Sequence, residues 1–316
     1  MITIADAFSD VDLALPDRRA GKVRVSFALP GGRRLFVTTD RLSAFDRILA
    51  AVPYKGQVLN QLAWWWFEQT RDVIANHALG QPDPNALIAC AADPLPVEVV
   101  VRGHITGVTS TSLWRRYHEG ARVIDGHRLP DGLRKNSALP APIITPTTKA
   151  GHGGHDEPLS VAEVVDRGLV AKDQWTAVVD AALALFERGC ALAAHAGLIL
   201  ADTKYEFGLA SGELLLIDEV HTPDSSRFWE ASSFAERFAA GAEPESLDKE
   251  VVRRAMIDAG YTGDGEPPEL ATTVWTETSR RYIRAFERLT GSTFAPGRYP
   301  VASRLEENLR AAGVLV

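Results

Sequence analysis

The chain reads Leu198-Ile-Leu-Ala-Asp-Thr-Lys-Tyr-Glu-Phe-Gly208 and continues, beyond Gly212, with Leu216-Ile-Asp218. Two apolar runs on either side of a glycine predict a β-hairpin, with its turn at residues 210–212. Because side chains alternate along a strand, Asp202, Lys204 and Glu206 share one face. The returning strand then brings Asp218 beside Lys204 or Glu206.

This face gathers three carboxylates and one lysine, and Arg227 follows just beyond the second strand. Crowded carboxylates raise one another's proton affinity unless cations neutralise them. Oxygen ligands without cysteine suit Mg²⁺, which keeps several waters and bridges substrate phosphates. The alternative is a solvated hairpin face with cross-strand ion pairs.

The length and composition set the class of protein. With 316 residues, the chain can form two compact lobes or one large domain with an appendage. A formal charge of −7 disfavours nonspecific binding to nucleic acid or to anionic membranes. Cys90 and Cys190 stand alone in apolar surroundings, which suits a reduced, cytoplasmic setting. We recognise neither a signal peptide nor an apolar stretch of membrane-spanning length.

The remaining chain shows several further elements. A second hairpin is expected at 22–40 around Gly31 and Gly32, and a helix at 57–78 whose tryptophans pack in the core. Prolines make 80–96 a linker, 97–102 reads as a short strand, and 129–157 as an aperiodic loop. Ser160 and Glu163 form a capping-box pattern before a helix, a second helix covers 172–196, and the chain is mostly helical after 234.

Two polar segments of the N-terminal part are candidates for binding. Lys22 and Arg24 share a hairpin face within reach of phosphates, although basic residues on a solvent face are common. Asp40 and Ser43 lie in a polar segment directly after a strand, where turn and cap chemistry is the alternative. The chain has neither a Walker A motif nor G-x-G-x-x-G, which disfavours P-loop and Rossmann enzymes.

Two later segments carry charges suited to anions. Lys149 and Asp156 lie in the aperiodic loop and favour a lid that closes on anionic groups. His152 and His155 lack a third ligand at zinc-site spacing. In the turn 223–227, backbone N–H groups and a guanidinium can hold a phosphate or a carboxylate.

Six polar or mixed blocks follow one another along the chain: Asp40-Arg-Leu-Ser-Ala-Phe-Asp46, Leu95-Pro-Val-Glu-Val-Val-Val-Arg-Gly103, Pro146-Thr-Thr-Lys-Ala150, His155-Asp-Glu157, Ala201-Asp-Thr-Lys-Tyr-Glu-Phe-Gly208 and Asp218-Glu-Val-His-Thr-Pro-Asp-Ser-Ser-Arg-Phe-Trp229. In this order they resemble the SAICAR synthetases (phosphoribosylaminoimidazole-succinocarboxamide synthases). The likeness runs from Gly21 to Trp229 and continues more weakly near Asp248-Lys-Glu250.

The chain departs from the family pattern at three places. Val25-Ser-Phe27 stands where the family has Asp-Ile-Tyr, and the segment 151–154 is rich in glycine instead of acidic residues. In 107–114, alignment on Trp114 makes Ser112 the family's serine. Three neighbours could replace it: Thr109, Ser110 and Thr111.

The resemblance implies an α+β fold of two lobes with ATP between them. Residues 1–92 would form a nucleotide-cover lobe with a kinase-like antiparallel hairpin, 93–240 the catalytic lobe and 241–316 a C-terminal helical extension. The implied reaction joins the carboxylate of CAIR (5-amino-1-(5-phosphoribosyl)imidazole-4-carboxylate) to the amine of L-aspartate in de novo purine biosynthesis. ATP would be converted to ADP and phosphate through an acyl phosphate. The enzyme would be a monomer or a homodimer, without nucleic-acid or membrane partners.

The resemblance also implies residue roles. Lys204 and Asp202 would be catalytic and contact CAIR or the acyl phosphate. Glu206 and Asp218 would bind Mg²⁺ and nucleotide, with Glu98 as a third candidate and Lys22 and Arg24 at the phosphates. The substrate-binding residues would be Arg102, Ser112, Lys149, Asp156, Asp224, Arg227, Asp40 and Ser43. A kinase-like phosphotransferase acting on a hydroxyl and a nucleotide-binding module without catalysis are the alternatives.

Overall fold

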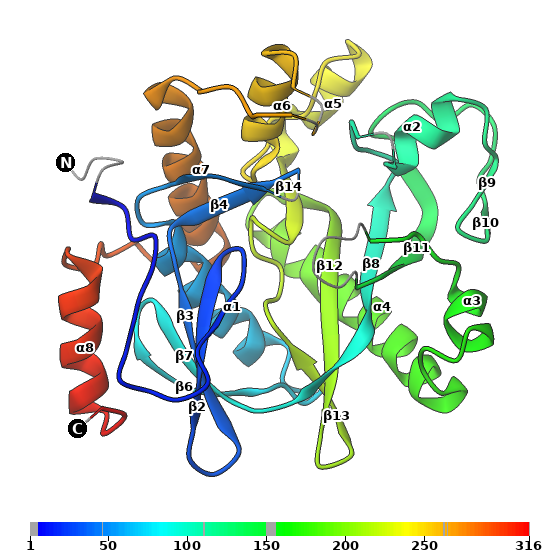
Figure 1. Cartoon of the computed structure of the whole chain (residues 1–316). Helices are drawn as coiled ribbons and strands as arrows, with labels where there is room; N and C mark the ends of the chain where they lie inside the picture. The colour runs from blue at the N-terminus through cyan, green and yellow to red at the C-terminus, as the bar shows by residue number, and fades with distance from the viewer. Residues whose placement is uncertain are drawn as a thin grey trace.

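The computed structural model describes residues 6–45, 47–109, 111–149, 156–261, 263 and 265–315. The chain folds into a mixed α/β structure in which two five-stranded sheets carry helices around them (Figure 1). The two sheets are joined at residues 75–77. There, Leu216 N donates to Ala75 O (3.0 Å) and His77 N donates to Leu216 O (3.1 Å).

The first sheet has the order β1 (Arg19–Ala20), β2 (Arg24–Leu29), β3 (Arg33–Thr38), β7 (Ala86–Cys90) and β6 (Ala78–Asp83). The predicted N-terminal hairpin is confirmed: β2 and β3 pair across Gly31 and Gly32, which both have positive φ. The expected linker at 80–96 is wrong, because β6, β7 and the start of the next strand fill it. β6 is an edge strand, where proline's missing N–H is tolerated.

The second sheet has the order β11 (Ala138–Thr148), β8 (Asp93–His104), β12 (Leu198–Ala210) and β13 (Glu213–Ile217), with β14 (Ser226–Glu230) also paired to β12. The predicted central hairpin is confirmed, and its turn residues Ser211 (φ 52°) and Gly212 (φ 83°) are both left-handed. Two positive φ values match the twist of a two-residue hairpin turn.

The expectation of an aperiodic loop at 129–157 is wrong for residues 138–148. These residues form β11, which pairs with β8 along most of its length. β11 is also an edge strand, and its register shifts between Ala138 and Ile143, where Pro140 and Pro142 lie. Prolines at an edge irregularity hide the alternation that a strand normally shows. The hypothesised lid is therefore confined to residues beyond Thr148, of which 150–155 lie outside the described residues.

The helices follow the sequence pattern closely. α1 (Lys55–Gln69) ends nine residues before the expected position 78, since the chain turns at Thr70 toward β6. Trp66 is fully buried in the main core, as predicted for the tryptophans. The capping box at Ser160 and Glu163 starts α3 (Val161–Asp166), and α4 (Lys172–His195) ends before Gly197, whose φ is 68°.

The C-terminal part is helical, as expected, and wraps back over the molecule. It contains α5 (Ala231–Ala239), α6 (Glu250–Asp258), α7 (Thr272–Thr290) and α8 (Val301–Ala311). α7 packs on α1, while α8 lies beside the first sheet and buries Val301, Leu305 and Leu309 against it (Figure 1). No helix within the described ranges is both long and apolar enough to cross a membrane. The smaller elements are β4 (Arg41–Ala44), β5 (Arg47–Ala51), α2 (Leu113–His118), β9 (Val123–Ile124) and β10 (His127–Arg128).

Candidate active site

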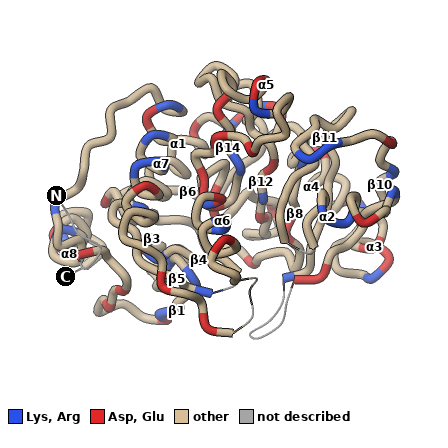
Figure 2. Tube along the Cα trace, turned by 90° about the horizontal axis from the view of Figure 1, so that it is seen from above, with Lys and Arg blue, Asp and Glu red and all other residues tan. Residues whose placement is uncertain are grey.

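A cleft of about 880 Å³ is lined by the β1–β2 segment, β8, β12, the turn at 218–227 and the start of α6. Acidic and basic residues intermingle around β12, β14 and α6 (Figure 2). The charged residues lining the cleft are Arg19, Lys22, Arg24, Glu98, Arg102, Asp156, Asp202, Lys204, Asp218, Glu219, Asp224, Arg227, Asp248, Lys249 and Arg253.

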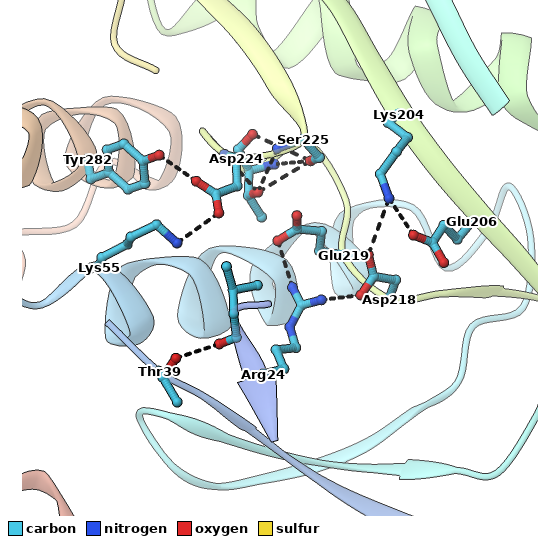
Figure 3. Close-up of polar contacts among 12 residues, drawn as sticks. Arg24, Thr39, Lys55, Lys204, Glu206, Asp218, Glu219, Asp224, Ser225 and Tyr282 are labelled. Carbon is cyan, nitrogen blue, oxygen red and sulfur yellow. Dashed lines mark hydrogen bonds and ion pairs between the residues drawn. The ribbon is translucent and has the colours of Figure 1, made fainter. Parts of the chain in front are cut away.

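Lys204 is the centre of the predicted carboxylate cluster. Its Nζ donates to Glu206 and lies 3.8 Å from Asp218 Oδ2 (Figure 3). It also donates to Glu98 Oε1 (3.0 Å). Burial alone would lower the pKa of Lys204, but the carboxylates outweigh it and hold that pKa well above its usual range. The expected convergence of the strand face and Asp218 is confirmed.

Asp218 and Glu219 hold the guanidinium of Arg24, which reaches across from β2. Nη1 of Arg24 donates to Asp218, and its Nη2 donates to Glu219 Oε2 (2.6 Å; Figure 3). Burial raises the pKa of Asp218 to about 6, against the opposing effect of Arg24. Asp218 also has a left-handed backbone (φ 68°), which Asp and Asn adopt more readily than most residues.

The carboxylates around Lys204 fit the implied Mg²⁺ in their donor chemistry. Within the described residues, no three His, Cys, Asp or Glu side chains are arranged to enclose an ion. Mg²⁺ however takes only one or two carboxylates when phosphates and waters complete its shell. Glu206 and Asp218 supply two oxygen donors with Glu98 beside them, and no sulfur lies among them.

Asp202 lies between two arginines on neighbouring strands. In the strand register Asp202 pairs with Arg102 of β8 and with Arg227 of β14. Oδ2 of Asp202 accepts from Nη1 of Arg102 (3.0 Å) and from Nη1 of Arg227. Nε of Arg102 donates to Thr145 Oγ1 (2.8 Å). Two guanidinium groups thus enter one end of the cleft.

Ser112 belongs to the same end of the cleft. A Cβ at Gly107 (φ 109°) would lie 2.5 Å from Ser112 Cβ and 3.7 Å from Nη2 of Arg227, so these groups crowd around the glycine. The Ser112 hydroxyl donates to Thr109 O (2.7 Å) and caps α2. Thr109 and Thr111 also line the cleft, whereas Ser110 lies outside the described residues.

Asp224 joins three distant parts of the chain. Its Oδ2 accepts from the buried Lys55 (2.7 Å), and its Oδ1 accepts from Tyr282 OH of α7 (2.5 Å; Figure 3). Burial would raise the pKa of Asp224, but Lys55 and Lys249 lower it well below its usual range. Both carboxylate oxygens therefore have protein partners.

The structure separates Asp40 from the other candidates. Ser43, Lys22 and Asp156 line the cleft as expected, but Asp40 is fully buried away from it. Asp40 accepts from Phe8 N (2.9 Å), Gly56 N (2.9 Å) and Tyr299 OH (2.7 Å). The expected substrate contact of Asp40 is therefore wrong. Its carboxylate has the capping role that was the alternative. Two further candidates do not line the cleft: Glu206 contacts the lining residue Lys204, and Lys149 lies behind Glu206 and contacts it.

Sequence reasoning missed several residues of this region, among them Lys55, Glu219, Lys249 and Arg253. The last three line the cleft, and Lys55 contacts Asp224 from beneath it. Lys249 and Arg253 come from α6 and its cap, and burial lowers the pKa of Lys249 to about 8. Two signals were available: Glu219 belongs to the family block 218–229, and Lys249 to the weaker likeness near 248–250.

Fold and cleft together are those of a mixed α/β protein whose cleft brings basic and acidic side chains together, as in enzymes that act on anionic small molecules. A family model described as SAICAR synthetase matches residues 17–268, and the chain belongs to this family. It is 46% identical to the phosphoribosylaminoimidazole-succinocarboxamide synthase of Legionella pneumophila (strain Lens), over 96% of this chain and 97% of that protein.

Solved structures agree with this assignment. The SAICAR synthase of Saccharomyces cerevisiae, solved with SAICAR, superposes with a TM-score of 0.77 at 30% identity, covering 92% of this chain and all of that one. A SAICAR synthetase solved with ADP superposes with a TM-score of 0.68 at 25% identity, covering 88% of this chain and all of that one.

Proposed function

We propose that this protein ligates L-aspartate to the carboxylate of CAIR, using ATP and Mg²⁺ and releasing SAICAR, ADP and phosphate. The observation that carries the proposal is the cluster of Glu98, Glu206 and Asp218 around Lys204, at the wall of a cleft that Arg102 and Arg227 also line. Family membership supports the choice of substrates. The relatives solved with SAICAR and with ADP support the product and the nucleotide.

The chemistry follows from the poor reactivity of a carboxylate. A CAIR carboxylate oxygen attacks the γ-phosphorus, ADP leaves, and the acyl phosphate forms. The aspartate amine then attacks the acyl carbon, the carbon–oxygen bond breaks and phosphate leaves. Such transfers depend on positioning and charge neutralisation. Lys204 neutralises the transferred group, and Lys22 and Arg24 contact the nucleotide phosphates.

Glu206 and Asp218, with Glu98 as a third candidate, would hold Mg²⁺, which supplies charge neutralisation at the phosphates when bound. Arg102, Arg227 and Ser112 bind the phosphate of CAIR. Lys149, Asp156 and Ser43 place aspartate, and Asp224 holds the turn that leads to Arg227. This division puts the nucleotide under the hairpin cover of residues 1–92 and CAIR on residues 93–240.

Coupled measurement of ADP release, with CAIR and L-aspartate omitted in turn, tests the function. We expect ADP release to require both substrates over many turnovers. Release that needs CAIR or another hydroxyl compound but no aspartate would indicate a kinase-like phosphotransferase. Tight ATP binding without any turnover would indicate a nucleotide-binding module instead.

A further inference from the structure

Asp202 of β12 lies between two arginines, Arg102 and Arg227, which come from the strands on either side of β12. Oδ2 accepts from Nη1 of Arg102 and from Nη1 of Arg227, and the Asp202 residue is only 4% exposed. Burial lowers the pKa of Arg102, because a desolvated guanidinium next to a second one is costly. A carboxylate between the two groups offsets that repulsion.

The same contacts fix the direction of both guanidinium planes. Arg102 is held at Nε by Thr145 and at Nη1 by Asp202. Arg227 is held at Nη1 by Asp202, and its Nε lies 3.6 Å from Glu250 Oε2. Nη2 of Arg227 is directed toward the loop of Gly107 and Ser112. An arginine held along one edge presents its remaining nitrogen to a ligand with little loss of side-chain entropy.

We infer that Asp202 is a positioning residue that aims Arg102 and Arg227 at one phosphate group of the substrate, and that it does not contact the reacting atoms. This inference rests on the proposed function for the identity of that substrate. It replaces the catalytic role expected for Asp202 from the family resemblance.

The direction in which one substitution changes phosphate affinity distinguishes a positioning role from a purely electrostatic one. Asp202→Asn removes a negative charge near the anion site, so Coulomb interactions alone would strengthen phosphate binding. Asparagine keeps one acceptor oxygen and turns an NH₂ group toward the second guanidinium, so misaligned arginines weaken binding instead. The inference therefore predicts weaker binding from a change that makes the site more positive.

The test compares wild type, Asp202→Asn and Asp202→Glu, with Asp83→Asn as a matched control. Asp83 is likewise buried against an arginine, Arg304, but outside the cleft. Calorimetry with ribose 5-phosphate should show an at least about tenfold loss of affinity for Asp202→Asn, since two charge-assisted contacts are misaligned. We expect a smaller loss for Asp202→Glu, less than about twofold for Asp83→Asn, and unchanged ADP affinity throughout.

Kinetics supply the second readout. At saturating CAIR, kcat of Asp202→Asn should stay within about threefold of wild type while the KM for CAIR rises. Unchanged or tighter ribose 5-phosphate binding would overturn the inference, as would a collapse of kcat with unchanged CAIR affinity. If Asp202→Asn does not fold, Asp202→Glu decides by the same criteria. A wild-type protein without CAIR- and aspartate-dependent ADP release would refute the proposed function only, since the ribose 5-phosphate comparison still decides the role of Asp202.

Discussion

Lys149, which follows the last residue of β11, donates to Oε2 of Glu206, while the other oxygen of that carboxylate accepts from Lys204. Burial would raise the pKa of Glu206, but the two ammonium groups outweigh it and hold that pKa well below its usual range. The carboxylate that we assign to Mg²⁺ is therefore ionised and occupied by a competing cation from the start of the proposed lid.

Lys149→Gln should consequently tighten Mg²⁺ binding. Removing a partly buried ammonium group from Glu206 removes a competitor worth about 0.5–1 kcal/mol, or roughly two- to fivefold in affinity. Isothermal titration calorimetry of Mg²⁺ into the protein with bound ADP measures this affinity directly. Lys135→Gln is the matched control, because Lys135 pairs with Glu243 outside the cleft. Weaker Mg²⁺ binding by Lys149→Gln would mean that Lys149 does not compete at Glu206.

Asp218→Asn should abolish turnover while keeping the fold. Asparagine tolerates the left-handed backbone at this position, so the shape of the turn is preserved. The loss of one preorganised charge at the phosphates should lower kcat at least about a hundredfold. Steady-state ADP release at saturating Mg²⁺ measures the effect, and near-normal turnover would refute the metal role of Asp218.

The sequence predicted the central hairpin and its charged face because alternation in two neighbouring strands is a local signal. β6 and β11 were missed because prolines in these edge strands break that alternation without preventing pairing. β7 is an inner strand of five apolar residues without proline, and it was missed because such a short run shows no alternation of its own. Asp40 was assigned to the substrate from its motif, but its carboxylate caps α1 at Gly56 N. A short polar segment cannot reveal which way its side chains face.

The missed site residues have a different cause. Lys55 meets Asp224 across 169 positions of the chain, and Lys249 reaches the cleft from the C-terminal part. Neither residue lies in a periodic polar pattern: Lys55 is the first residue of α1, and Lys249 precedes α6 between Asp248 and Glu250. Convergence over such distances is set by the packing of whole elements, and no local periodicity in the sequence reveals it.

Gly107→Ala should weaken CAIR binding at least about tenfold, since the new Cβ would displace Ser112 and strain a backbone at φ 109°. Gly120→Ala is the control: its φ is 105°, but nothing lies within 4 Å of the added Cβ. Both variants carry similar backbone strain, so only the first should raise the KM for CAIR. Equal KM values in the two variants would remove the loop at Gly107 from the substrate site.

Lys249 should make anion binding depend on pH. Burial lowers the pKa of its amine to about 8, with Arg253 adding to the effect and Asp224 opposing it. The amine is charged below that pH and neutral above it, so CAIR affinity should fall as the pH rises through about 8. A phosphate monoester is already dianionic above about pH 7, so its own titration does not interfere. Lys249→Arg keeps the charge and should abolish this fall in affinity. If Lys249→Arg and the wild type show the same pH profile of CAIR affinity, Lys249 is not the source of the pH dependence.

Arg304→Met tests how the C-terminal helix α8 holds the first sheet. Nε and Nη2 of Arg304 each donate to the fully buried Asp83 carboxylate at 3.0 Å, and Asn308 donates to the same group at 2.6 Å. Removing the arginine leaves a buried charge without its main partner, which costs about 3–5 kcal/mol of unfolding free energy. Urea unfolding measures this loss.

In the double variant Asp83→Asn/Arg304→Met much of the lost unfolding free energy should return, because neither charge remains buried. If Arg304→Met unfolds at the wild-type urea concentration, α8 is held by its apolar contacts alone and the buried ion pair adds nothing to stability.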